Sequence, residues 1–249
     1  MRFVIFSGTT EGRELSALLA KAGAQVTVCV ASDYGSEEQG EIPGVKTSTG
    51  PLSPGEKQTL LRECALCIDA THPYATHVTA SVREACSNTG TPYLRLLRPV
   101  SEAGNAKCFD SAEAAAAWLG QREGNILLTT GAKELEAYAA IDPERLFPRI
   151  LPSHQSLDAC ELLRIPHRNI IAMQGPFSSE LNKAIIHQYR IRYLVTKDGG
   201  VPGGFPEKAE AARETGIELV LLCRPEESGM DFGTVYQKCI TLIQNSDAI

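Results

Sequence analysis

Residues 3–30 read FVIFSGTTEGRELSALLAKAGAQVTVCV and decide the fold class. Residues 3–6 are a short apolar run that ends at Ser7-Gly8, a pattern typical of a buried strand. Residues 11–22 carry leucines at helical spacing, and Gly23 marks the end of that helix. Residues 25–30 are a second apolar run. A strand, a helix and a strand in this order predict a parallel pair joined by a right-handed crossover.

The same alternation continues to the end of the chain and predicts an α/β fold, in which helices cover both faces of parallel sheets. Residues 99–107 are small and polar and form the best linker, so we expect two lobes, 1–100 and 101–249. Further strands are expected at 66–70, 92–97, 125–128, 145–151, 169–173, 193–196 and 218–223. Further helices are expected at 54–64, 73–87, 112–119, 133–138, 154–163, 179–187, 208–215 and 232–244.

The composition narrows the function classes. A net charge of −6 gives no overall basic character for nucleic-acid binding, and the apolar runs are strand-sized, which predicts no membrane span. No secretory signal precedes the first strand, so we expect a cytoplasmic protein whose eight cysteines are reduced. Cys64 and Cys67 have redox-motif spacing but run into a strand, which favours a buried structural pair. No metal-ligand spacing accompanies them, so no metal site is predicted.

Ligands of open parallel sheets bind beyond the carboxyl ends of the strands, where this chain gathers small and hydroxylated residues. After the first strand, Gly8 is expected at positive φ, and Gly12 is expected to allow close approach of a strand or phosphate. Thr9 and Thr10 stand beside a helix N-terminus, which favours anions. Glu11 would repel a pyrophosphate unless it faces the helix dipole or a ribose. After the second strand, Ser32 suits a 2′-phosphate whereas Asp33 suits a ribose diol, so NADPH and NADH both remain open.

The later strand ends offer other candidates. His72 is either a ligand contact or a helix-start residue, and Lys133 and Lys197 are either anion-binding cations or solvated lysines. The four glycines around Pro202 form either a ligand lid or ordinary turns: Gly199, Gly200, Gly203 and Gly204. No nucleophile triad or paired carboxylates stand out, which is compatible with chemistry carried by a cofactor.

Taken together, seven motifs in order resemble the precorrin-6A reductase and cobalt-precorrin-6A reductase family of cobalamin biosynthesis. They are SGTTEGR at 7–13, DATHPYA at 69–75, TTGAK at 129–133, RILP at 149–152, GPFS at 175–178, VTKD at 195–198 and EKAEAA at 207–212. The resemblance implies two Rossmann-like lobes with a ligand cleft between them. It also implies hydride transfer from NADPH or NADH to a double bond of a tetrapyrrole substrate, and contact with neighbouring enzymes of corrin synthesis is possible.

The resemblance and the strand-end positions together assign roles to residues. Expected catalytic residues are His72, Tyr74 and Lys197, although a dedicated acid need not exist. Expected cofactor-binding residues are Gly8, Thr9, Thr10, Glu11, Gly12, Ser32, Thr71, His72, Thr130, Gly131, Lys133, Gly175, Pro176, Phe177, Ser178, Lys197 and Asp198. Expected substrate-binding residues are Arg13, Arg149, Gly199, Gly200, Gly203 and Gly204. The alternatives are another NAD(P)-dependent oxidoreductase, or a sensing module that binds a dinucleotide without catalysis.

Overall fold

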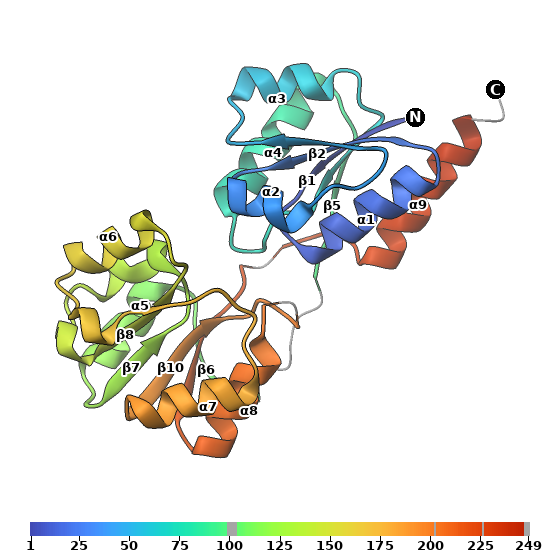
Figure 1. Ribbon diagram of the computed structural model, residues 1–249. Helices are drawn as coiled ribbons and strands as arrows, with labels where there is room; N and C mark the ends of the chain where they lie inside the picture. Colours follow the sequence, from blue (N-terminus) through green and yellow to red (C-terminus); the bar gives the residue numbers. More distant parts are fainter. Residues whose placement is uncertain (99–103, 202, 226, 247–249) are drawn as a thin grey trace. The chain divides into compact units, whose positions relative to one another are not determined.

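The structure, a computed structural model, describes residues 1–98, 104–201, 203–225 and 227–246 and forms two compact units (Figure 1). Unit 1 comprises Met1–Pro99 and Glu226–Ile249, and unit 2 comprises Val100–Pro225. Both units are parallel sheets flanked by helices, which confirms the predicted α/β class.

The unit 1 sheet has the strand order β3-β2-β1-β4-β5, with every pairing parallel. Its strands are β1 (Arg2–Phe6), β2 (Gln25–Val30), β3 (Val45–Thr49), β4 (Leu66–Asp69) and β5 (Tyr93–Arg95). The central strand β1 is buried on both faces. Phe3 and Ile5 pack into one core and Val4 and Phe6 into another. Burial on two faces explains why this segment is apolar throughout instead of alternating.

Helices cover both faces of this sheet. They are α1 (Thr10–Lys21), α2 (Asp33–Gln39), α3 (Pro54–Leu61), α4 (Thr76–Thr89) and α9 (Phe232–Ser246). Helices α1 and α9 lie side by side on the Phe3 face, and α3 and α4 supply the core on the Val4 face (Figure 1). Helix α1 begins where it does because Thr9 Oγ1 accepts the Gly12 amide hydrogen at 3.2 Å.

The unit 2 sheet has the order β6-β11-β10-β7-β8-β9, again parallel. Its strands are β6 (Lys107–Phe109), β7 (Asn125–Leu128), β8 (Leu146–Ile150), β9 (Ile171–Ala172), β10 (Ile191–Lys197) and β11 (Glu218–Leu222). One face packs against α5 (Ala112–Gly120), the 3₁₀ helix η1 (Ala132–Tyr138) and α6 (His154–Leu162). The other face packs against α7 (Ser179–Gln188) and α8 (Phe205–Thr215). Two further 3₁₀ turns are η2 (Pro143–Arg145) and η3 (His167–Asn169).

The C-terminal helix corrects the predicted domain division. Residues 232–244 were expected in the second lobe, but α9 belongs to unit 1, where Val235, Cys239 and Ile243 share a core with Leu15 and Leu19. The chain returns to unit 1 beside β5, because the Met230 amide donates to the Arg95 carbonyl and the Leu97 amide donates to the Met230 carbonyl. Most of the predicted linker, residues 99–103, lies outside the described residues.

Candidate functional site

Each unit brings predicted loops together at a point where the strand order reverses. In unit 1 this switch point lies between β1 and β4, so the loops after Phe6 and Asp69 are neighbours. In unit 2 it lies between β7 and β10, so the loops after Leu128 and Lys197 are neighbours. Switch points are where open α/β sheets bind ligands.

The first loop of unit 1 is tied to its neighbour across the switch point. Thr9 Oγ1 donates to the Ala70 carbonyl at 2.9 Å while it caps α1. A Cβ on Gly12 would lie 2.5 Å from Ser7 Oγ and 2.9 Å from the Ala70 Cβ, so the predicted close approach at Gly12 is confirmed. It is an approach of helix to strand, the role that the third glycine plays in dinucleotide-binding turns.

Gly8 differs from the expectation. Its φ is not positive, so the predicted left-handed turn is wrong. The residue is exposed, and the nearest atom to a Cβ built on it is the His72 amide nitrogen at 3.9 Å. A side chain at Gly8 is therefore compatible with the fold, and would occupy the space before the N-terminus of α1.

Glu11 is neutralised by a partner that the sequence did not reveal. Arg98 donates from Nη2 to Oε2 at 2.6 Å and from Nε to Oε1 at 2.8 Å. Partial burial raises the pKa of Glu11, but the hydrogen bond and charge from Arg98 outweigh it and hold this pKa below its ordinary value. With its charge paired in this way, Glu11 opposes an anion at the neighbouring helix N-terminus far less than an isolated carboxylate would.

A buried ion-pair network fixes the loop after β4. Arg95 Nη1 lies 2.9 Å from Asp69 Oδ1, and Arg95 Nη2 lies 2.8 Å from Glu227 Oε2. Asp69 Oδ1 also accepts from the amide and hydroxyl of Thr71, at 3.0 and 2.7 Å, and Oδ2 accepts from the Tyr93 hydroxyl at 2.9 Å. Asp69 is therefore a positioning residue for Thr71, with its acceptor oxygens already used within the protein.

His72 and Tyr74 follow directly in the turn that leads to α4. Their ring centroids are 5.4 Å apart, and the Tyr74 amide donates to His72 Nδ1 at 3.4 Å. Both side chains are half-buried. The structure thus brings the two predicted proton-transfer candidates together at the switch point of unit 1.

Two predicted residues of unit 1 have structural partners elsewhere. The Ser32 hydroxyl caps α2 by accepting the Gly35 amide hydrogen at 3.1 Å. Arg13 donates from Nε to the Gln39 carbonyl at 3.1 Å, near the end of α2. The roles expected for them toward ligands remain predictions.

The switch point of unit 2 holds a buried hydroxyl that has no hydrogen-bond partner in the described part of the chain. Thr130 Oγ1 is buried and makes no hydrogen bond among the described residues. Beside it on the sheet, Lys197 Nζ lies 2.6 Å from Glu134 Oε1, and Asp198 pairs with Arg224 at 2.9 Å. Because buried hydroxyls are normally hydrogen-bonded, Thr130 is a natural contact for a ligand.

The glycine loop after β10 is closely packed. A Cβ on Gly203 would lie 2.7 Å from the Gly199 Cα, which explains why these two positions are glycine. Gly200 and Gly204 have positive φ values of 66° and 65°. Of the two roles weighed for this loop, the geometry supports a compact turn into α8.

Arg149 and the 175–178 segment also meet in unit 2. The Arg149 guanidinium carbon lies 4.1 Å from the centroid of the Phe177 ring, and Nη1 donates to Asn182 Oδ1 at 2.7 Å. The bond between Gly175 and Pro176 is cis, and Ser178 caps α7. Gly131 adjoins Thr130 in the loop that begins η1, and Lys133 in η1 is exposed.

Several residues of these sites were not predicted. Arg95 is the last residue of β5 and Arg98 follows three positions later, so the carboxyl end of this strand was the available signal. Lys208 occupies the buried face of α8 together with Phe205, Ala211 and Ala212. A lysine on an apolar stripe at helical spacing was the available signal.

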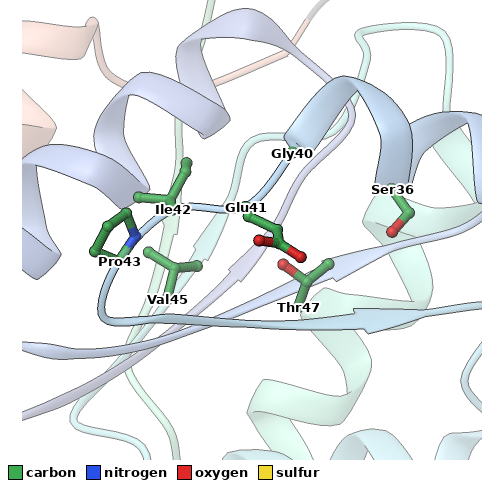
Figure 2. A pocket seen from close by; sticks show the side chains of 7 residues that line it. All are labelled: Ser36, Gly40, Glu41, Ile42, Pro43, Val45 and Thr47. Atoms are coloured by element: carbon green, nitrogen blue, oxygen red, sulfur yellow. The ribbon is translucent and has the colours of Figure 1, made fainter.

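A separate pocket of 590 Å³ lies beside α2 and the start of β3 (Figure 2). Among the described residues that line it, Glu41 alone is ionisable, and its side chain points toward Thr47. The other lining residues are Ser36, Gly40, Ile42, Pro43 and Val45. None of the predicted site residues is among those that line this pocket.

In the described part of the chain, no group of three or more His, Cys, Asp or Glu side chains is placed to hold a metal ion. Among the described helices, none is long and apolar enough to cross a membrane. All eight cysteines are free thiols, and Cys64 and Cys67 are buried as expected.

Comparison with known proteins gives a consistent result. The family described as precorrin-6x reductase CbiJ/CobK matches residues 2–243. The cobalt-precorrin-6A reductase of Methanothermobacter thermautotrophicus is 35% identical over 235 residues, covering 91% of this chain and 77% of the relative. Its counterpart in Priestia megaterium is 33% identical over 242 residues, covering 94% and 93%. A solved structure described as CobK precorrin-6A reductase matches with a TM-score of 0.75 over 96% of both chains at 23% identity, which shows a shared fold.

Proposed function

Because the chain belongs to the precorrin-6x reductase family, we propose that it reduces cobalt-precorrin-6A with a nicotinamide dinucleotide. The observation that carries this proposal is the match along nearly the whole chain to relatives named for that reaction. The reaction adds a hydride to one carbon of a ring double bond and a proton to its neighbour. When bound, NADPH or NADH would supply the hydride and leave as the oxidised nucleotide.

The first loop of unit 1 fits a dinucleotide phosphate. Gly8 leaves open space, Thr9 sets the start of α1, and the charge of Glu11 is held by Arg98. We propose that the amides at the N-terminus of α1 bind a phosphate oxygen there, because a helix N-terminus favours an anion. Gly12 contributes by bringing α1 against β1 and β4.

In unit 2, we propose that Thr130 and Lys197 bind polar groups of the ligands. Thr130 has an unused hydroxyl, and Lys197 is a partly exposed cation at a switch point. The substrate of the family is a planar ring with many carboxylates, which suits cations placed at strand ends. Most of the rate enhancement would come from holding the reacting groups in position.

We propose His72 and Tyr74 as the groups that deliver the proton. They lie together in the switch-point loop of unit 1, and Asp69 and Arg95 fix the backbone that carries them. Contact with neighbouring enzymes of corrin synthesis remains a prediction.

The test uses the purified full-length chain with cobalt-precorrin-6A or precorrin-6A and with NADPH or NADH. We expect loss of the reduced-nicotinamide absorbance that depends on the tetrapyrrole, fastest with the cobalt form. If the chain bound a nucleotide but oxidised it in none of the four combinations, the proposal would be refuted and a sensing module would be favoured. Equal rates with both tetrapyrroles would refute only the preference for cobalt.

A further inference from the structure

Two buried cations form no ion pair within the described part of unit 2. Arg149 in β8 is 6% exposed and Lys208 in α8 is 8% exposed. Among the described residues, neither side chain forms an ion pair within 4.0 Å, whereas Lys197, Arg224 and Lys183 in the same unit all do. A buried charge without a counter-ion is costly, so its presence calls for a reason.

The contacts of the two cations leave much of their capacity unused. Arg149 Nη1 donates to Asn182 Oδ1 at 2.7 Å, and Lys208 Nζ donates to the Gly203 carbonyl at 2.8 Å. Burial lowers the pKa of Lys208 to about 8, and the charge of Arg149 lowers it further than burial alone, which shows that the two cations repel each other. Burial also lowers the pKa of Arg149 to about 10.

The surroundings of Arg149 and Lys208 are polar and favour the binding of an anion. Two helix N-termini converge there, because a Cβ on Gly204 before α8 would lie 3.9 Å from Pro176 and 4.0 Å from Phe177 before α7. Ser179 lies on α7 one turn before Asn182, and its Oγ is buried with no hydrogen bond among the described residues.

Glu207 is the acidic group beside the pair. Its charge raises the pKa of Lys208, but burial and Arg149 prevail. Its Oε2 is buried without a hydrogen-bond partner in the described part of the chain. Two cations against one carboxylate leave a net charge of about +1 at two helix N-termini, which favours one further anion.

We propose that Arg149 and Lys208 form a subsite for one anionic oxygen group of a ligand, with Ser179 as a further donor. The inference rests on the proposed function for the source of that group, which is either a carboxylate of the tetrapyrrole or a phosphate of the nucleotide. Both supply an anionic oxygen to a guanidinium and an ammonium. Lys208 thereby joins Arg149 as a ligand-binding residue.

The test compares the wild-type chain with Lys208→Met, Lys208→Gln and Arg149→Met. Lys183→Met is the matched control, because Lys183 is a surface lysine on α7 paired with Glu214. Thermal unfolding confirms that each variant folds before binding is measured. Lys208→Gln keeps a donor for the Gly203 carbonyl while it removes the charge. If one of the two Lys208 variants fails to fold, the other still tests the subsite.

Dissociation constants for NADPH and KM for the tetrapyrrole identify the source. A charge-assisted hydrogen bond is worth about 1.5–3 kcal/mol, so the affected constant should rise about 10- to 150-fold. A higher dissociation constant for NADPH would assign the site to a phosphate of the nucleotide. A higher KM for the tetrapyrrole would assign it to a carboxylate of the substrate. Both constants staying within about twofold of wild type in a folded Lys208 variant would overturn the proposal.

A second readout does not depend on turnover. Inorganic pyrophosphate and citrate, each compared with potassium chloride at matched ionic strength, should raise the melting temperature of the wild type and of Lys183→Met but not of Lys208→Met. Equal stabilisation of wild type and Lys208→Met by both probes would count against the subsite. If the wild type oxidised neither nucleotide, the proposed function would fail while this comparison still decided whether the anion site exists.

Discussion

Replacing Lys208 by methionine should stabilise unit 2 at neutral pH. The ammonium is buried in α8, and its pKa lies at about 8 against an ordinary value of 10.5. Each pH unit between these values is worth about 1.4 kcal/mol, so the buried charge costs unit 2 roughly 3 kcal/mol. Methionine fills a similar volume without the charge, but it gives up the hydrogen bond to the Gly203 carbonyl, worth about 1 kcal/mol. The variant should therefore gain roughly 2 kcal/mol.

The pH dependence of this gain has a definite sign. Below pH 8 both the folded and the unfolded chain hold the lysine proton, so the full cost of the buried charge is present. Between pH 8 and 10.5 the unfolded chain binds more protons than the folded one, and the stability of the wild type rises with pH. The advantage of Lys208→Met should therefore shrink above pH 8, at about 1.4 kcal/mol per pH unit, and vanish near about pH 9.5.

The single tryptophan makes the measurement specific to unit 2. Trp118 lies in α5, with the Arg122 guanidinium carbon 3.7 Å from its ring centroid, so its fluorescence reports the unfolding of the unit that contains Lys208. Urea unfolding of wild type and variant at pH 7, 8 and 9.5 gives the difference in unfolding free energy at each pH. A variant that is less stable than wild type at pH 7, by an amount unchanged at pH 9.5, would refute the reasoning.

Four further predictions follow from the packing and charges of the two units. Arg95→Met leaves Asp69 and Glu227 without their shared cation, so unit 1 should lose about 3–5 kcal/mol of unfolding free energy by circular dichroism; a loss under about 1 kcal/mol would contradict this. Gly12→Val places a Cβ 2.5 Å from Ser7 Oγ and should cost unit 1 about 1–3 kcal/mol in the same assay, whereas wild-type stability would show that α1 shifts freely. A Cβ at Gly8 would meet no atom closer than 3.9 Å, so Gly8→Val should keep the wild-type stability within about 0.5 kcal/mol. Its nucleotide affinity, measured by titration, should fall at least about tenfold. Normal affinity would show that the loop is only a turn. Lys197→Ala removes a partly exposed cation and should weaken ligand binding far more than it lowers the melting temperature, so a loss of thermal stability with unchanged binding would argue against its role.

The central strands were predictable because each is buried on both faces. Residues 25–30 and 125–128 coincide with β2 and β7, since a continuous apolar run bounded by turn residues has few other interpretations. Two of the edge strands, β3 and β6, were not predicted, for the opposite reason. β3 reads VKTST with no fully buried residue, and β6 is a three-residue strand, so neither produces a hydrophobic signal.

Ion pairs between residues far apart in the chain could not be predicted from the sequence. The strand-end rule located Glu11 and Asp69, but Arg98 lies 87 positions after Glu11. Arg95, which pairs with Asp69, has a second partner in Glu227, 132 positions further along the chain. Local patterns carry no information about such distances. The same limit applies to α9, whose amphipathic stripe predicts a helix but leaves open which core it covers, and it covers that of unit 1.

The buried charges divide into two kinds, and the division carries functional meaning. Asp69, Arg95 and Glu227 satisfy one another, as do Glu11 and Arg98, so these groups fix loops and gain little from a ligand. Arg149 and Lys208 have no such compensation within the described residues, although an apolar side chain at either position would serve the core better. Functional sites commonly hold groups that lower stability, because activity or binding depends on them. The unpaired cations are therefore where ligand binding should raise stability most, and Lys208→Met should gain intrinsic stability while losing most of the stabilisation that the ligand provides.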